Sequence, residues 1–222
     1  MDMSAPVVTL SAAYGAGGSV VGPRVARMLG VQFVDRAIPV AVADRLSVPL
    51  DEALEHDGRD ERGLGRLIVS FARAPVATGW APPLPMLDPC MFKDETARVI
   101  REVASGGAVI LGRAGALVLK DNPAVLRVRL DGPVDARVAQ VVRLGGMDER
   151  EARRNQRDTD RARDAYVKHF YGADATDARL YHLVIDSTAI DLDACAELIA
   201  TAARARQRPA AGEPPAASSS AA

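Results

Sequence analysis

The chain has 222 residues, of which 48% are hydrophobic, and a formal net charge of −1. This is enough chain for one sizeable core, and the near-neutral charge argues against nucleic acid as a partner. The two cysteines, Cys90 and Cys195, lack the spacing of a zinc or redox site. No stretch approaches the length of a membrane span or has the pattern of a leader. We therefore expect a soluble, cytoplasmic protein with no membrane partner.

A glycine-rich segment lies between a predicted strand at residues 7–10 and a predicted helix at 20–29. Glycines let backbone N–H groups approach phosphate oxygens, and the helix N-terminus adds partial positive charge. We expect Ser19 to ligate Mg²⁺ through its hydroxyl. The alternatives are an ordinary turn and a serine that only caps the helix. The residues predicted to bind phosphate are Gly15, Ala16, Gly17, Gly18 and Ser19.

This segment departs from the usual phosphate-binding pattern G-x-x-x-x-G-K-[ST] at two positions. Ala12 replaces the first glycine of the pattern and Gly18 replaces the lysine, whereas Gly17 and Ser19 match it. The lysine normally brings positive charge to the transferring phosphate. Two hypotheses therefore stay open: a phosphotransferase, and a regulatory module that binds nucleotide or phosphate without transferring it. Lys168 is the nearest candidate for a replacement lysine.

The rest of the chain alternates between strands and helices. Apolar, β-branched runs predict strands at 31–34, 108–111, 125–130 and 183–185. Helices are predicted at 94–104, from Pro133 to about 145, from a cap at Asp148, and at 192–206. Such alternation favours a mostly parallel sheet covered on both faces, in a three-layer α/β/α fold.

Two segments fall outside this alternation. Residues 46–93 include a proline-rich stretch, 75–89, which we expect to be irregular and to belong to an insertion. Residues 207–222 are rich in Pro, Ala and Ser, and we expect a disordered tail. Residues 1–206 are then a single domain.

Further polar residues follow directly after predicted strands, where parallel sheets bind their ligands. Arg113 is a candidate clamp for an acceptor phosphate, although it could instead pair with a neighbouring carboxylate at the surface. Asp35 and Arg36 are candidate substrate contacts, and Asp35 could equally cap the next helix.

An arginine-rich segment at 155–163 brings positive charge onto a predicted helix. Arg157 and Arg161 have i, i+4 spacing, and Arg163 lies alongside. Convergent guanidinium groups are natural stabilisers of a phosphoryl group in transfer. The alternative is a solvated helix with Asp–Arg pairs.

Together these segments resemble the cytidylate kinase-like family, a divergent branch of the P-loop nucleoside monophosphate kinases. The resemblance is carried by residues 15–19, 25–30, 33–36, 111–114, 160–163, 170–172 and 180–186. It implies a P-loop core with a five-stranded sheet, a helical insertion at about 46–93 that binds the nucleoside monophosphate, and an arginine lid at about 148–172. Cytidylate kinases differ from this chain by carrying lysine where it has Gly18 and aspartate where it has Ala114.

The resemblance also implies an activity: transfer of the ATP γ-phosphoryl group, with Mg²⁺, to a nucleoside monophosphate or a similar small phosphorylated acceptor. Residues 15–19 would hold the ATP phosphates, and Asp35 and Arg113 would contact the acceptor. Arg157, Arg161 and Arg163 would close over the transferring group as catalytic residues.

Overall fold

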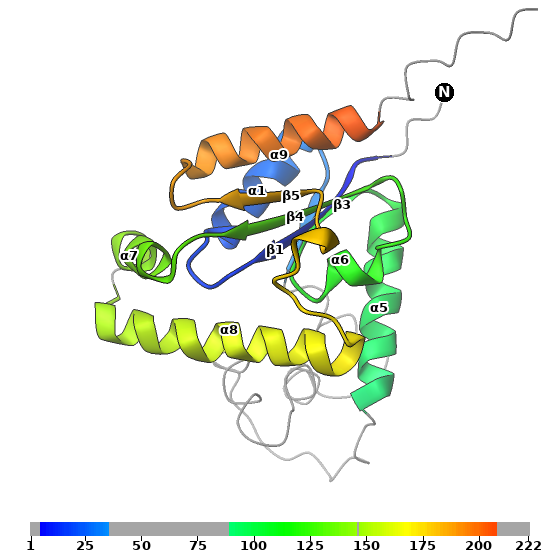
Figure 1. Cartoon of the computed structure of the whole chain (residues 1–222). Helices are drawn as coiled ribbons and strands as arrows, with labels where there is room; N and C mark the ends of the chain where they lie inside the picture. The colour runs from blue at the N-terminus through cyan, green and yellow to red at the C-terminus, as the bar shows by residue number, and fades with distance from the viewer. Residues whose placement is uncertain (1–4, 36–88, 146, 208–222) are drawn as a thin grey trace, which may run out of the picture.

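The computed structural model describes residues 5–35, 89–145 and 147–207, which form a five-stranded parallel sheet with helices on both faces (Figure 1). The strand order is β2-β3-β1-β4-β5, and every neighbouring pair is parallel. This confirms the predicted α/β class. The strands are β1 (Val7–Ala12), β2 (Gln32–Val34), β3 (Ala108–Leu111), β4 (Val125–Asp131) and β5 (Leu183–Asp186).

Helices cover both faces of the sheet, and two further helices follow β4. Helices α1 (Gly18–Leu29) and α9 (Leu192–Gln207) cover one face of the sheet, and α5 (Pro89–Ser105) and α6 (Gly115–Val118) cover the other. Helix α7 (Val134–Gly145) follows β4, and α8 (Glu149–Tyr171) then runs below the sheet towards α5 (Figure 1). A short 3-10 helix, Ala178–Leu180, precedes β5.

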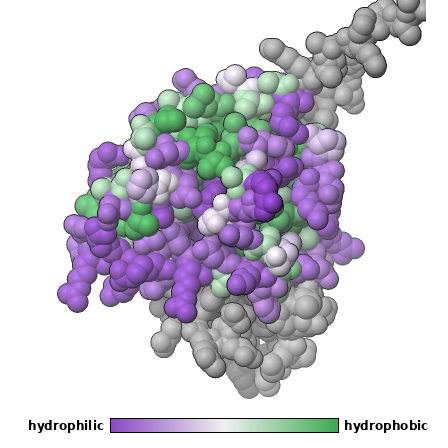
Figure 2. Space-filling view, in the orientation of Figure 1, coloured by the Kyte–Doolittle hydropathy of each residue, from purple (hydrophilic) through white to green (hydrophobic). Residues whose placement is uncertain are grey.

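The core divides along the two faces of the sheet because successive strand residues point to opposite sides. Val8 and Leu10 of β1 are buried with residues of α1 and α9, whereas Val7 is buried with residues of α5. In Figure 2 a hydrophobic area lies over β5 and α9, and the surface over α8 is hydrophilic. No helix within the described ranges is long and apolar enough to span a membrane.

Most predicted elements are found, with shifts at their ends. The predicted strand at 108–111 coincides with β3. Helix α1 begins at Gly18, two residues before the predicted start, and keeps Pro23 inside it. Helix α5 begins at Pro89, five residues before the predicted start at 94, so residues 89–93 are helical and not irregular, since proline is compatible with a first helical turn. The rest of the predicted insertion, Arg36 and the tail from 208 onward lie outside the described residues.

The predicted cap of α8 is confirmed. The Asp148 carboxylate accepts a hydrogen bond from the Glu151 backbone N–H at 2.9 Å, which satisfies one of the unpaired donors of the first turn. The helix ends at Gly172, whose φ of 62° is left-handed. A single continuous helix of 23 residues therefore spans most of the region expected to be a lid.

Candidate functional site

The loop between β1 and α1 is held in a conformation that needs glycine. Gly15 and Gly17 have φ values of 80° and 75°, in the left-handed region that side chains disfavour. Gly17 caps α1 without a side-chain hydrogen bond, and Gly18 is the first helical residue. The chain thus turns sharply from the carboxyl end of β1 into the N-terminus of a helix.

Every backbone carbonyl from residue 12 to residue 17 accepts a hydrogen bond from the protein itself. Two of these bonds are local: the Ala13 carbonyl accepts from the Ala16 N–H, and the Gly17 carbonyl accepts from the first turn of α1. The other four carbonyls accept from side chains of distant elements. These bonds are Arg163 to Ala12 (2.7 Å), Arg137 to Tyr14 (2.6 Å), Gln140 to Gly15 (2.9 Å) and Ser187 to Ala16 (2.7 Å).

Only some of the backbone N–H groups in the same loop are hydrogen-bonded within the described protein. Those of Ala13, Tyr14 and Ala16 donate to protein acceptors. Within the described part of the chain, four N–H groups have no acceptor: those of Gly15, Gly17, Gly18 and Ser19. With its acceptors engaged and these donors unused, the loop presents hydrogen-bond donors together with the positive end of the α1 dipole. Such a surface has the hydrogen-bond donors and the positive charge that suit an anion.

Asp160 of α8 joins that helix to this loop and to Arg137 of α7. Asp160 accepts a hydrogen bond from the Tyr14 N–H at 2.7 Å, and its other oxygen lies 2.8 Å from the Arg137 guanidinium. Burial alone would raise the pKa of Asp160. Hydrogen bonds from Tyr14, Gln156 and Arg137, together with the Arg137 charge, outweigh burial and lower the pKa below its usual range. Asp160 is therefore ionised at neutral pH.

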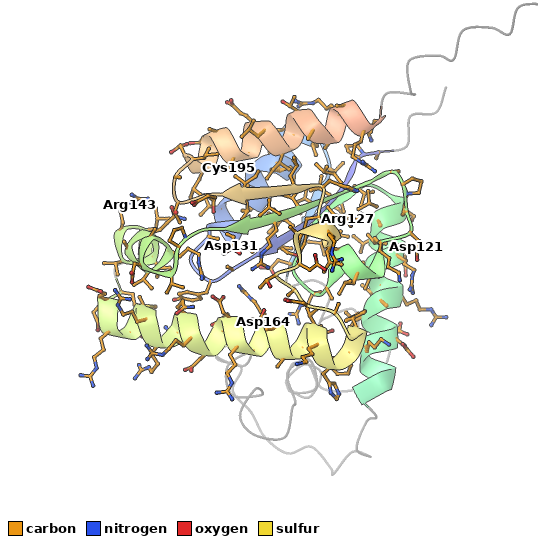
Figure 3. The ribbon with its side chains drawn as sticks, viewed as in Figure 1. Asp121, Arg127, Asp131, Arg143, Asp164 and Cys195 are labelled. Carbon is orange, nitrogen blue, oxygen red and sulfur yellow. The ribbon has the colours of Figure 1, made fainter. Side chains whose placement is uncertain are left out.

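A second cluster of arginines and aspartates lies at the end of β4. Arg129 pairs with Asp131 at 2.8 Å, and the same carboxylate lies 3.7 Å from Arg137. In Figure 3, Asp131 at the end of β4 and Asp164 on α8 mark the two sides of this region. Arg129 and Arg137 are thus neutralised by carboxylates that belong to the fold.

The end of β3 forms a strained turn beside the loop. Gly112, Arg113 and Ala114 have φ values of 74°, 55° and 52°, so two residues with side chains adopt the left-handed conformation. Burial lowers the pKa of Arg113, and this pKa is also influenced by the charges of Asp35 and Arg163 and by the Tyr166 phenol. Arg113, Asp35, Tyr166 and Arg163 are therefore within electrostatic reach of one another.

Position 18, where the usual pattern has lysine, has no space for a side chain. A Cβ atom at Gly18 would lie 2.7 Å from the Ala12 Cβ and 3.0 Å from Leu111 Cδ1, closer than side chains pack. The Ala12 methyl group thus occupies space that a side chain at position 18 would need. The two departures from the phosphate-binding pattern therefore lie against each other in the structure.

A comparison of the sequence with models of protein families finds a match. The family model described as the cytidylate kinase-like family matches residues 7–189. The chain belongs to this family. The match spans the loop, the strained turn after β3 and the whole of α8.

Similar proteins of this kind include two archaeal cytidylate kinases. The protein of Methanopyrus kandleri is 35% identical over 103 residues, which are 42% of this chain and 53% of that protein, so the match spans about half of its length. The protein of Aeropyrum pernix is 28% identical over 119 residues, or 54% of this chain and 69% of that protein. A crystal structure of an uncharacterized protein from Eubacterium ventriosum shares the fold, with a TM-score of 0.65, 20% identity, and coverage of 90% of this chain and 99% of that chain.

For a member of the cytidylate kinase-like family, the predicted site residues fall into three groups. Residues 15–19 form the loop, and Arg163 reaches it directly. Asp35 and Arg113 lie at the ends of β2 and β3, within electrostatic reach of Arg163. Arg157 and Arg161 are exposed and form no hydrogen bond or ion pair with the loop in the described ranges. Arg36 lies outside those ranges.

Several residues at the site were not predicted from the sequence. Each of these residues either holds the loop or approaches it from α8. They are Arg137, Gln140, Asp160, Tyr166 and Ser187. A signal for Asp160 was present: buried Ala152, Thr159 and Ala162 define the inward face of α8, and Asp160 lies beside it. The contacts of Gln140 and Ser187 had no such signal, since their partners are backbone carbonyls far away in the sequence.

The loop also fits the cofactor that the family implies. Ser19 is exposed in the first turn of α1, so its hydroxyl is accessible to a metal ion held beside the phosphates. In the described ranges no group of three or more His, Cys, Asp or Glu side chains could hold a metal ion without help.

Proposed function

We propose that this protein is an ATP-dependent phosphotransferase that moves the γ-phosphoryl group of ATP to a nucleoside monophosphate or a similar small phosphorylated acceptor. The observation that carries the proposal is the loop at 12–19, where every carbonyl through Gly17 is engaged and four N–H groups remain unused in the described residues. Membership of the cytidylate kinase-like family supports the reaction class.

In this proposal the chain's own residues act on the phosphates in three places. The N–H groups of Gly15, Gly17, Gly18 and Ser19 bind phosphate oxygens of ATP, and Arg163 approaches from α8. An acceptor phosphate oxygen bonds to the γ-phosphorus while the bond to the β–γ bridging oxygen breaks, and that electron pair leaves with ADP. Mg²⁺, held by Ser19, would neutralise charge on the phosphates.

The acceptor belongs, in this proposal, at the ends of β2 and β3. Arg113 offers a planar guanidinium for the acceptor phosphate, and Asp35 offers a hydrogen-bond acceptor for its other polar groups. Arg113 lies in the strained turn at residues 112–114, directly after β3. Arg157 and Arg161 remain proposed members of a lid that closes over the bound nucleotides.

A coupled assay with ATP, Mg²⁺ and each of the cytidine, uridine, adenosine and guanosine monophosphates tests this function. We expect turnover with at least one acceptor, and a fall of about 100-fold in Ser19→Ala. Ser105→Ala, at the exposed end of α5, is the matched control and should keep full activity. Absence of turnover with every acceptor, in a protein that is folded, would contradict the proposal.

A nucleotide-binding regulatory module is the second candidate function. It is favoured by Gly18, because backbone N–H groups can hold an anion when no loop lysine is present. Saturable binding of MgATP without turnover on any acceptor would favour this module over the phosphotransferase.

A further inference from the structure

With glycine at position 18 the loop carries no cationic side chain of its own, whereas Arg163 of α8 reaches the loop. We propose that Arg163 brings to the ATP phosphates the positive charge that a loop lysine brings in the usual pattern, and that the Ala12–Gly18 pair marks this exchange. The inference rests on the proposed function, because it concerns the phosphates bound at the same loop.

The first observation that supports this role is the position of Arg163. Its Nη1 donates to the Ala12 carbonyl oxygen at 2.7 Å. A side chain at position 18 would also start against residue 12, since its Cβ would lie 2.7 Å from the Ala12 Cβ. The arginine of α8 and the absent lysine of α1 therefore converge on the same end of the loop from different elements.

The charge of Arg163 carries the second step. Arg129 and Arg137 are each within 3 Å of a carboxylate oxygen, at 2.8 Å in both cases. Arg163 forms no salt bridge in the described ranges, and its hydrogen bond goes to a carbonyl. The Arg163 side chain is exposed, and desolvation together with the charges of Arg129 and Arg137 lowers its pKa against the opposing charges of Asp160 and Asp35. A guanidinium stays protonated under such shifts and keeps further N–H donors for a phosphate.

The placement of α8 carries the third step. Asp160, one turn before Arg163, accepts from the Tyr14 N–H and from Arg137, so this turn of the helix is attached to the loop. The guanidinium is consequently positioned before any nucleotide binds, which reduces the entropy cost of organising it. Lys168, the nearest candidate from the sequence, is exposed in the last turn of α8 and has no contact with the loop in the described residues.

Three variants of the full chain test the role of Arg163. We expect Arg163→Ala to lower turnover by about 100-fold and Arg163→Lys to retain activity within about tenfold, because a cation is kept. The matched control is Arg154→Ala, an exposed arginine on the same helix, which should stay within about twofold. Calorimetry gives a second readout, in which Arg163→Ala weakens MgATP about tenfold and MgADP less, since the γ-phosphate loses its partner.

A second test measures Arg163→Ala in two backgrounds, the native loop and a loop with lysine restored. It separates replacement of the lysine charge by Arg163 from a purely structural role of Arg163. In Ala12→Gly/Gly18→Lys the loop regains both glycine and lysine, and Arg163→Ala should then cost less than about tenfold, because the lysine supplies the charge. An equal cost of Arg163→Ala in both backgrounds overturns the proposal.

The outcomes also separate this inference from the proposed function. If MgATP binds and no acceptor is phosphorylated, the phosphotransferase proposal fails, and the binding series alone decides the role of Arg163. Equal MgATP affinity in the native chain and in Arg163→Ala then overturns the inference, whether or not the double variant folds. If no triphosphate binds to the native chain, both proposals are wrong.

Discussion

The pair Ala12 and Gly18 defines the loop at the scale of single residues. The 2.7 Å separation between the Ala12 Cβ and a Cβ placed at position 18 is far below normal contact. A lysine therefore cannot be restored at Gly18 by one substitution without displacing residue 12 or Leu111. The same crowding explains why a residue without a Cβ atom fits the first position of α1.

Gly18→Ala tests this crowding. We expect the substitution to lower the free energy of unfolding by about 1–2 kcal/mol, because the new methyl group overlaps Ala12 and outweighs the better helix propensity of alanine. Denaturant unfolding measures the change.

The matched background is Ala12→Gly, which removes the opposing methyl group. There, Gly18→Ala should be neutral or stabilising, and the two sites should couple by about 1 kcal/mol or more. Additive effects of the two substitutions would show that the methyl groups do not meet.

At the scale of elements, helix α8 is attached to the loop through a charged contact. The Asp160 side chain is 20% exposed and that of Arg137 only 6% exposed, so their 2.8 Å contact is largely shielded from water. Arg137 belongs to α7, and Tyr14, the other partner of Asp160, belongs to the loop. The Asp160 carboxylate thus joins α7 and α8 to the loop between β1 and α1.

Asp160→Asn should lower the free energy of unfolding by about 2–3 kcal/mol at pH 7, because it leaves the buried Arg137 charge less compensated. The pKa of Asp160 is lowered in the folded state, so the unfolded state takes up its proton first as the pH falls. The contribution is therefore present at neutral pH and is lost as acid is added, between about pH 5 and pH 3. The difference between native chain and variant should shrink across this window in urea unfolding.

Asp158→Asn on the same helix is the control for this prediction. Asp158 forms no hydrogen bond or ion pair in the described ranges, and its substitution should cost less than about 0.5 kcal/mol at pH 7. A difference for Asp160→Asn that stays constant down to pH 3 would contradict the role given to its charge.

The elements were largely predictable from the sequence, whereas the orientation of α8 was not. The buried strands are short apolar runs with a clear pattern, and the cap at Asp148 follows a local rule. The i, i+4 spacing drew attention to Arg157 and Arg161, yet the inward face is set by small buried residues such as Ala152 and Ala162. In a helix so rich in charge, the few apolar positions decide which arginine meets the loop.

At the scale of the whole molecule, the loop is held by parts of the chain that are far apart in sequence. Arg137 and Gln140 come from α7, Arg163 from α8, and Ser187 from the turn after β5, 171 residues from Ala16. Only the folded sheet brings these side chains to the carbonyls of Ala12, Tyr14, Gly15 and Ala16. Sequence patterns are local, so they identified the loop and Arg163 but not the contacts of Arg137, Gln140 and Ser187.

If the loop binds nucleotide as proposed, binding should stabilise the whole fold, because the loop is held by distant elements. MgATP at about 100 times its dissociation constant should stabilise the native chain by about 2.7 kcal/mol. For a chain of this size, that free energy raises the melting temperature by about 5–10 °C. Adenosine, which has no phosphate for the loop, should give a much smaller shift in the same thermal melt.

Ser187→Ala connects this shift to the orientation of the loop. The Ser187 hydroxyl is buried and donates to the Ala16 carbonyl at 2.7 Å, so its removal leaves that carbonyl without a side-chain donor. We expect a loss of about 1–2 kcal/mol in the free energy of unfolding, because a buried acceptor becomes unsatisfied. The MgATP-induced shift, at the same ligand concentration, should also become smaller, since a released carbonyl can turn its oxygen towards the phosphates. A destabilised variant that keeps the full MgATP shift would instead mean that Ser187 supports the fold without orienting the binding loop.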